Sequence, residues 1–397
     1  MTNIVDPNGQ RKILPINKML VIAVLLAGLV NLFIYSTAAT KAYTSSTTGV
    51  TTNAIPGDSP QLLQHEGLTA TPQPWEDGMR LDPVPGTYEW WYIQGTFEDG
   101  SHAEFTFFPK PWFETSLSLD PFVAVVITSP DGKISSDFIH GSSTQFTASR
   151  GQTNVTIGNN NWLRGDLKTY QLHVQSPKGF GADLFFERTA PSARGGGGTG
   201  KFFLDPSLTR YIGWFIALPS AKVHGTLTYN GETHKVQGEG YHDHNWGTVG
   251  FNQVLDRWFW TTGHFGNYTL DAFVQVASAY YNHQPMPAFY LAKGNQVLIQ
   301  DMRHLTVQGT GNITAPGGHD YPKVLNFRWH NGSDTVKLSL TNPKIVRAAS
   351  PIVVTNATIY GNPEYLRLSG NGTLNVNIGG KNETTSSPIV WEVNYGH

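Results

Sequence analysis

The sequence predicts an all-β protein that is long enough for two domains. Its 397 residues include 42 glycines and 24 prolines, while charged residues make up only 14% and aromatic residues 12%. Glycine and proline favour turns, and a chain of this length with so little charge can bury a core. No stretch has the period of a long amphipathic helix. Short apolar and aromatic runs alternate instead with turn signals, as in a β-sandwich or barrel.

The strongest strand signals flank short turns. Residues 88–97 and 103–108 lie on either side of Asp99-Gly100, and this arrangement predicts a hairpin. Similar runs follow along the whole chain. The further expected strands cover 122–129, 133–140, 145–149, 170–175, 182–188, 211–218, 225–229, 234–241, 258–264, 270–280, 288–293, 297–303, 326–330, 334–341, 365–368, 373–378 and 389–393.

Charge and cysteine content exclude several classes of protein. The formal net charge is −2, so the chain lacks the basic surface that binds nucleic acid. It has no cysteine, which excludes disulfides, thiolate metal sites and cysteine nucleophiles. The fold must therefore depend on its buried core.

The N-terminal residues 1–40 predict a targeting segment. The charges of Arg11, Lys12 and Lys18 precede a mostly apolar run over 19–39. A secretory signal with a cleavage point near 37–39 is one interpretation, and a single membrane anchor is the other. Both predict a cytoplasmic N-terminus, so we expect a secreted or membrane-anchored protein of the secretory pathway, with its body lumenal or extracellular.

Composition divides the rest of the chain. Residues 41–71 are rich in Thr, Ser, Pro and Gly and predict a linker. We expect an N-terminal β-domain over 72–255 and a C-terminal β-domain over 256–397.

Seven Asn-x-Ser/Thr sequons support the secretory route, because glycans are added to such sites along it. Two of them, Asn331-Gly332 and Asn371-Gly372, are expected in hairpin turns. The predicted glycosylation sites are Asn154, Asn267, Asn312, Asn331, Asn356, Asn371 and Asn382.

The densest chemistry lies in the stretch GEGYHDHNWG, residues 238–247. Successive side chains of a strand point to opposite faces. An extended stretch would sort its side chains into Glu239, Tyr241, Asp243 and Asn245 on one face, and His242, His244 and Trp246 on the other. A surface loop without function is the alternative, because Gly, Asn and Asp also mark turns.

Two aromatic clusters accompany this stretch. YEWWYIQGTFEDG begins at Tyr88, GEGYHDHNWG follows about 150 residues later, and RWFW begins at Arg257. This order of motifs resembles the hydroxyneurosporene synthase (carotenoid hydratase) and AttH-like family, which includes fungal lipocalin-like Diels–Alderases and hetero-Diels–Alderases. The resemblance covers the chain from about residue 75. It implies two lipocalin-like β-domains with a lipophilic substrate between or within them, but it does not fix the reaction.

Other chemistries fit the residues less well. A His-x-His pair can bind zinc, but a catalytic site needs a third protein ligand, and no spacing selects one among His102, Glu104 and His264. We therefore predict no metal and no cofactor. A serine nucleophile lacks its Gly-x-Ser-x-Gly turn. A glycosidase could use Glu89 with Glu104, but the sequence does not give their separation.

Proton transfer in an aromatic pocket is the preferred interpretation. Burial against indole rings raises the pKa of a carboxyl group, so that it can donate a proton near neutral pH. Imidazoles exchange protons there too, and aromatic faces stabilise a developing cation. The predicted catalytic residues are His242, Asp243, His244 and Glu89. The predicted substrate-binding residues are Trp90, Trp91, Tyr241, Asn245, Trp246, Trp260 and His264.

Structural roles compete with these assignments. Trp90 and Trp260 could belong to the core, and Trp112 and Trp214 are interpreted as core. A buried hydrogen-bond network around Asp243 could also pin the junction between the domains.

Residues and resemblance together predict a cofactor-free cyclase acting on a lipophilic terpenoid or polyketide intermediate. The expected reaction is a Diels–Alder or hetero-Diels–Alder closure, with or without a preceding loss of water that generates the reactive diene. One alternative is a hydratase of an isoprenoid double bond, and another is a lipocalin-like carrier without catalysis. The expected partner is a small lipophilic molecule, with no nucleic acid and with membrane contact only through an uncleaved N-terminal segment.

Overall fold

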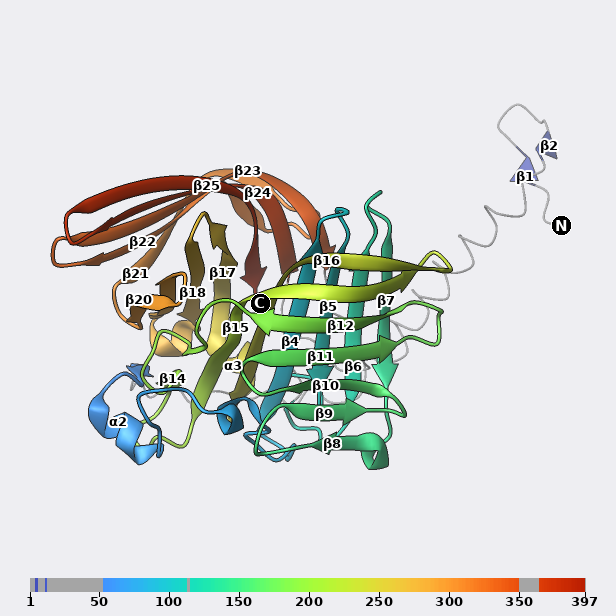
Figure 1. Cartoon of the computed structure of the whole chain (residues 1–397), viewed down its shortest axis with the longest axis horizontal. Coiled ribbons are helices and arrows are strands. Elements are labelled where there is room, and N and C mark those ends of the chain that lie inside the picture. Colours follow the sequence, from blue (N-terminus) through green and yellow to red (C-terminus); the bar gives the residue numbers. More distant parts are fainter. Residues whose placement is uncertain (1–3, 6–10, 13–52, 113–114, 350–363, 397) are drawn as a thin grey trace. The chain divides into compact units, whose positions relative to one another are not determined.

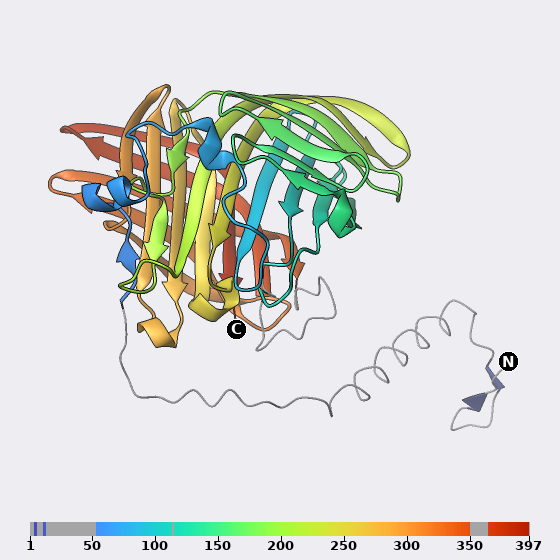
Figure 2. The ribbon, with the colours of Figure 1, turned by 90° about the horizontal axis from the view of Figure 1, so that it is seen from below.

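Two antiparallel β-sheets make up most of this computed structural model, which describes residues 4–5, 11–12, 53–112, 115–349 and 364–396 (Figure 1). Within these ranges the first sheet joins 14 strands and the second joins 9. The prediction of an all-β protein is confirmed. Figure 2 shows the second sheet, in orange and red, beside the green and cyan strands of the first.

The first sheet comprises the strands between residues 55 and 247. They are β3 (Ile55–Pro56), β4 (Tyr88–Phe97), β5 (His102–Phe108), β6 (Phe122–Thr128), β7 (Ile134–His140), β8 (Phe146–Ala148), β9 (Asn154–Ile157), β10 (Asn161–Gly165), β11 (Thr169–Gln175), β12 (Gly181–Arg188), β13 (Ala193–Arg194), β14 (Lys201–Phe203), β15 (Tyr211–Tyr229) and β16 (Glu232–Gly247). Its main order is β7-β6-β5-β4-β16-β15-β12-β11-β10-β9-β8.

The second sheet follows in the order β20-β19-β18-β17-β25-β24-β23-β22-β21. Its strands are β17 (Leu255–Phe265), β18 (Tyr268–Ala277), β19 (Pro285–Lys293), β20 (Gln296–Asp301), β21 (Leu305–Thr314), β22 (Asp320–Asn331), β23 (Asp334–Ala349), β24 (Glu364–Ile378) and β25 (Lys381–Tyr395). The helices are short: α2 (Pro60–His65), η1 (Pro74–Asp77), η2 (Ser143–Gln145), α3 (Phe251–Val254) and η3 (Ala279–Tyr281).

The long hairpin of β15 and β16 forms the middle of the first sheet. Asn230 and Gly231 connect the two strands with φ angles of 54° and 82°, values that Asn and Gly tolerate best and that a tight hairpin turn requires. β16 pairs with β15 on one side and with β4 on the other. The stretch 238–247 is therefore a central strand rather than a surface loop.

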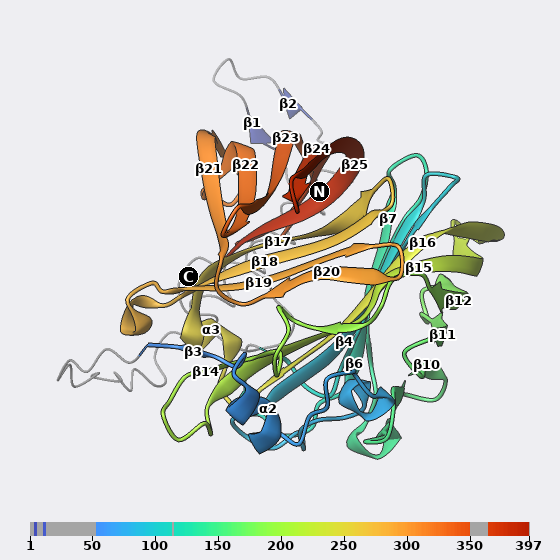
Figure 3. The same ribbon diagram turned by 60° about the vertical axis from the view of Figure 1, so that its left-hand side comes forward.

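Within the described ranges, three apolar cores hold the sheets. One fills the curl of the first sheet, which Figure 3 shows turning from β7 towards β10, and another fills the curl of the second. The third core lies between the sheets, where β15 contacts β17 and β18, and it includes Trp214, Tyr241 and Trp260. Each strand of the first sheet near this junction thus has two covered faces.

Several strand predictions differ from the structure. The runs 211–218 and 225–229 belong to the single strand β15, because two irregular steps in its register let it bend without ending. Asn331-Gly332 is a hairpin turn as predicted, but Asn371-Gly372 lies inside β24 and its turn assignment is wrong. β24 pairs on both sides there, and these ladders override the local turn preference.

The N-terminal predictions concern residues that are described only in part. The apolar run over 19–39 lies outside the described residues, whereas Ile4–Val5 (β1) pairs with Arg11–Lys12 (β2). No helix within the described ranges is long and apolar enough to cross a membrane. In the predicted linker, β3 pairs with β14, and Asp58 forms an ion pair with Arg303.

Contacts divide the chain into two compact units, Met1–Val50 and Thr51–His397. Both large sheets belong to the second unit. The predicted division into domains at 255/256 falls between β16 and β17, and independent folding of the two parts stays a prediction.

Candidate functional site

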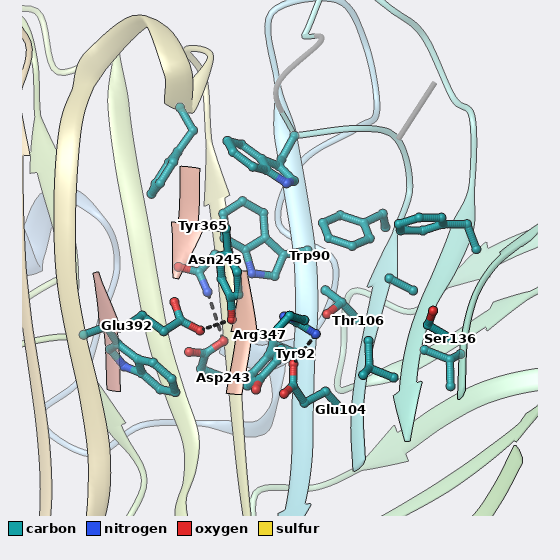
Figure 4. A pocket seen from close by; sticks show the side chains of 18 of the residues that line it. Trp90, Tyr92, Glu104, Thr106, Ser136, Asp243, Asn245, Arg347, Tyr365 and Glu392 are labelled. Carbon is teal, nitrogen blue, oxygen red and sulfur yellow. Dashed lines mark hydrogen bonds and ion pairs between the residues drawn. The ribbon is translucent and has the colours of Figure 1, made fainter. Parts of the chain in front are cut away.

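A cavity of about 820 Å³ lies between the two sheets (Figure 4). One wall is formed by β4, β5, β6 and β7 with β15 and β16, and the other by β17, β18, β23, β24 and β25. Five indole rings line it: Trp90, Trp112, Trp214, Trp258 and Trp260. A concave, mostly apolar space of this size suits a small lipophilic molecule.

The aromatic walls support one another. The ring of Trp90 lies 6.2 Å from that of Trp112 and 5.7 Å from that of Phe251. Tyr92 meets Trp260 edge to face at 6.2 Å across the two sheets. Such packed rings hold their positions without a ligand, so the walls of the cavity are formed in advance.

Asp243 is the acid of the cavity wall, and three side chains donate hydrogen bonds to its carboxyl group. Trp214 Nε1 and Tyr241 Oη donate to Oδ2 over 2.9 and 2.8 Å, and Asn245 Nδ2 donates to Oδ1 over 3.0 Å. The register explains this arrangement: residues 241, 243 and 245 share one face of β16, and Trp214 pairs opposite Asn245. The donors fix the carboxyl in one orientation.

Burial governs the acidity of Asp243. The side chain is 6% exposed, and loss of water raises its pKa, while the hydrogen bonds from Trp214 and Tyr241 lower it in part. The balance raises the pKa of Asp243 to about 7. A carboxyl with this pKa can give up a proton and take one back near neutral pH.

A buried ionic network lies beside this acid. Arg347 Nη1 pairs with Glu104 Oε2 at 2.9 Å, and Arg367 pairs with Glu104 Oε1 at 3.2 Å and with Glu392 Oε1 at 3.1 Å. Tyr365 Oη also donates to Glu392 over 2.6 Å. Burial would raise the pKa of Glu104, but the two guanidinium groups outweigh it and hold the pKa far below its usual value. The network joins the sheets and places the Arg347 cation on the cavity wall.

The opposite face of β16 carries a second polar group, which we call the histidine clasp: Asp77, Glu89, His242 and His244. His242 Nε2 lies 3.0 Å from Asp77 Oδ2, and His244 Nε2 lies 2.8 Å from Glu89 Oε1. Glu89 also accepts from the backbone N–H of Arg80. The clasp therefore ties the chain after η1 to strands β4 and β16.

The partners of His242 define its charge. Its Nδ1 lies 2.7 Å from the carbonyl oxygen of Tyr92, which can only accept, and its Nε2 faces the Asp77 carboxylate. Both ring nitrogens therefore carry hydrogen, as in the imidazolium form. Burial lowers the pKa of His242, but the charge of Asp77 raises it more. Asp77 responds in the opposite direction: His242 outweighs burial and lowers its pKa.

The structure divides the predicted site residues between these two faces, as the alternation in the sequence indicated. Those that line the cavity are Trp90, Asp243, Asn245 and Trp260. Tyr241 lies behind them and donates a hydrogen bond to Asp243. Those on the face opposite the cavity are Glu89, Trp91, His242, His244 and Trp246. His264 lies apart from the cavity, with its Nε2 3.9 Å from Glu239.

Several residues in the cavity wall or next to it were not predicted from the sequence. Trp214 is a donor to Asp243 rather than only a core residue. Asp271, Arg347, Arg367, Tyr365 and Glu392 come from distant strands of the second sheet. A buried charge within an apolar strand, such as Arg367 in YLRLSG, is the one local signal that could have marked them.

The described residues contain no group of three His, Cys, Asp or Glu side chains arranged to hold a metal ion. His242 and His244 each direct Nε2 to a carboxylate.

The sequons lie at the surface where they are described. All but Asn356 fall in the described ranges, and each of these asparagines is exposed. Asn356 lies outside the described residues. Attachment of glycans stays a prediction.

Two curled antiparallel sheets with an acid in the cavity between them define a lipocalin-like protein with a candidate small-molecule site. The model of the AttH-like family matches residues 83–344, and the chain belongs to this family.

Relatives extend the comparison. The quinolone epoxide rearrangement protein penF of Penicillium thymicola is 30% identical over 181 residues, which cover 45% of this chain and 42% of that protein. Hydroxyneurosporene dehydrogenase of Chlorobaculum tepidum is 26% identical over 216 residues, which cover 46% of this chain and 54% of that protein. The chain thus spans about half the length of the curated relatives it matches.

The fold is shared with a solved structure. Kievitone hydratase from Nectria haematococca superposes with a TM-score of 0.51 at 14% identity, covering 86% of this chain and 98% of that one. At this identity the likeness concerns the fold alone.

Proposed function

We propose that the protein is a cofactor-free enzyme that binds a lipophilic, unsaturated small molecule in the cavity between the sheets and cyclises or rearranges it with acid assistance. One observation carries the proposal: Asp243, with a pKa raised to about 7, lies in an aromatic cavity of about 820 Å³. A neutral carboxyl in such a place can protonate an oxygen or double bond of the ligand.

Each part of the cavity has a role in this proposal. Asp243–H donates its proton to the substrate, and Trp214, Tyr241 and Asn245 stabilise the carboxylate that remains. The indole faces of Trp90 and Trp260 hold the substrate folded and stabilise positive charge as it develops. Ring closure or migration then returns a proton to Asp243, so the reaction needs no net proton.

The finer assignment is a Diels–Alder or hetero-Diels–Alder closure of a terpenoid or polyketide intermediate. Acid assistance suits such a closure, because a proton or hydrogen bond on a carbonyl group of the substrate makes the adjacent double bond more electrophilic. The name of penF, a rearrangement protein, supports isomerisation without loss of atoms as the reaction class.

The experiment compares apolar metabolites of the source organism with and without the gene by mass spectrometry, and then incubates the accumulated precursor with purified protein. We expect a precursor of the same mass as the missing product, converted by the wild type. Asp243→Asn should lower turnover at least about 100-fold. Asp183→Asn is the control, because Asp183 pairs with His173 and is largely exposed away from the cavity.

Other outcomes would identify other functions. Conversion of the precursor to a product that is heavier by one water would show that the protein is a hydratase. Binding of the precursor without conversion would show that it is a carrier. Full activity of Asp243→Asn would contradict the proposed acid.

The proposed location is the secretory pathway. The predicted N-terminal segment and the exposed sequon asparagines support it. Treatment of the native protein with an endoglycosidase should lower its apparent mass, and an unchanged mass would argue against the glycosylation sites.

A further inference from the structure

In the described part of the chain, the cavity is lined by two cationic side chains, Arg347 and Lys178. Lys178 is largely exposed to solvent and pairs with Asp137 at 2.7 Å. Arg347 lies deeper: its side chain is 28% exposed, and its guanidinium lies 4.7 Å from the ring centre of Tyr365. Figure 4 shows it beside Glu104 in the cavity wall. Arg347 is therefore the cation that a bound molecule would meet inside the cavity.

The two arginines of the ionic network differ in how far their guanidinium groups are used. A guanidinium has five N–H groups to donate. Arg367 is 1% exposed and directs its nitrogens to Glu104, Glu392 and Gln94. Arg347 forms one ion pair within the described residues, from Nη1 to Glu104 Oε2 at 2.9 Å. Part of the Arg347 guanidinium thus stays open to the cavity.

Glu104 does not depend on Arg347 alone for its charge balance. Its other oxygen, Oε1, lies 3.2 Å from Arg367 Nε and 3.1 Å from His102 Nε2. An arginine and an imidazole therefore remain beside Glu104 without Arg347. A further cation in an apolar wall gives up part of its hydration, and a charged partner on the ligand would restore that loss.

The register of the first sheet places this cation apart from the cavity acid. Asp243 pairs opposite Tyr92, and Tyr92 pairs opposite Thr106. The Cα atoms of Asp243 and Thr106 are therefore two strand spacings apart, about 10 Å. Glu104, the partner of Arg347, lies two residues from Thr106 and so on the same face of β5. The acid and the cation can thus contact different parts of one ligand.

We propose that Arg347 binds a carboxylate of the substrate, so that the substrate is a lipophilic, unsaturated carboxylic acid. The inference rests on the proposed function, in which Asp243 acts on the unsaturated part of the same molecule. A guanidinium matches the two oxygens of a carboxylate, and this pairing fixes orientation as well as adding affinity. The apolar body of the substrate would then lie along the indole rings. The added negative charge would also favour the protonated form of Asp243.

Binding of a fluorescent acid and its ester tests the carboxylate subsite without the natural substrate. The probes are cis-parinaric acid, a conjugated polyene whose fluorescence rises in apolar surroundings, and its methyl ester. Both have the same apolar chain, but only the acid carries a charge. We expect the full-length wild type to bind the acid about tenfold or more tightly than the ester, because a charge-assisted hydrogen bond contributes a factor of that size.

Arg347→Met keeps a long apolar side chain and leaves Arg367 to pair with Glu104. We expect its preference for the acid to disappear through weaker binding of the acid, with the Kd of the ester nearly unchanged. Arg347→Lys keeps the charge but not the planar fork, so its preference should be intermediate. Arg150→Met is the matched control, because Arg150 forms a surface ion pair with Asp82 away from the cavity. It should retain the wild-type preference.

The outcomes separate this subsite from the proposed function. Equal affinity of the wild type for acid and ester, or an unchanged preference in Arg347→Met with an intact circular dichroism spectrum, would overturn the carboxylate subsite. Equal losses for acid and ester would also overturn it, because they would assign Arg347 a purely structural role. None of these results would affect the role of Asp243. Full activity of Asp243→Asn would remove the proposed function while the preference for the acid stands.

Discussion

Trp214 Nε1 donates a hydrogen bond to Asp243 Oδ2 over 2.9 Å. The two residues come from neighbouring strands of the long hairpin, and Trp214 also packs edge to face on Phe273 of the second sheet at 5.1 Å. One indole thus contributes to the core between the sheets and partly offsets the effect of burial on the pKa of the cavity acid. Packing and chemistry are linked at this residue.

Trp214→Phe should raise the pKa of Asp243 further. The indole donor stabilises the carboxylate, so its loss favours the protonated acid. We expect the alkaline limit of the pH–rate profile to move up by about one pH unit. A hydrogen bond to a charged group contributes about 1.5–3 kcal/mol, and one pKa unit corresponds to about 1.4 kcal/mol. Trp162→Phe is the control, because Trp162 stacks on His173 away from the cavity. A lower limit in Trp214→Phe would contradict this account.

The pH dependence of stability offers a test without substrate. The pKa of Asp243 is raised from its ordinary 3.8 to about 7, so its contribution to folding is fully present below pH 3.8 and is lost as the pH rises to about 7. Asp243→Asn removes the titration. We therefore expect the Tm of the variant to fall less than that of the wild type between pH 4 and 7, as measured by differential scanning calorimetry. Parallel curves would show that Asp243 does not titrate in this range.

The histidine clasp should respond differently to pH. Because the pKa of His242 is raised, its contribution to stability is full below pH 6.5 and is lost as the pH rises through its pKa in the folded protein. Because the pKa of Asp77 is lowered, its contribution to stability is full above pH 3.8 and is lost as the pH falls through its pKa in the folded protein. The pair is therefore fully formed between pH 3.8 and 6.5.

Breaking the clasp should cost stability. Removal of one member of a buried ion pair leaves the other charge without a partner, so His242→Ala and Asp77→Asn should each lower the free energy of unfolding by about 3–5 kcal/mol. The double variant should lose much less than the sum, because the second change removes the unpaired charge. Urea titration measures both effects, and additive losses would show that the two residues do not interact.

Sequence and structure agree where local patterns decide the outcome. The alternation in GEGYHDHNWG correctly separated Tyr241, Asp243 and Asn245 from the histidines. The pattern could not say which face meets the cavity, because both faces of β16 are covered, one by the chain after η1 and one by the second sheet. The histidines and Glu89 were therefore assigned to catalysis although they do not line the cavity.

Long-range partners account for the rest. Trp214 meets Asp243 through the pairing of β15 with β16, and Tyr241 meets Trp260 through the packing of the two sheets. Arg367 forms an ion pair with Glu104, which lies 263 positions earlier in the sequence (367 minus 104). The sequence of one strand shows which of its side chains share a face, but it does not show which residues of a distant strand they will meet.

Ligand affinity should depend on the indoles of the cavity. Trp90 lines it and packs against Phe108, Trp112 and Phe251, so Trp90→Leu removes a flat contact surface while keeping an apolar residue. A neutral aromatic dye such as Nile red should bind the wild type with enhanced fluorescence, and its Kd should rise about tenfold in the variant, because one lost aromatic contact of about 1.4 kcal/mol corresponds to that factor. Trp162→Leu provides the matched control on the far side of the first sheet. Equal affinities of wild type and Trp90→Leu, with circular dichroism showing an intact fold in both, would place the lipophilic site elsewhere.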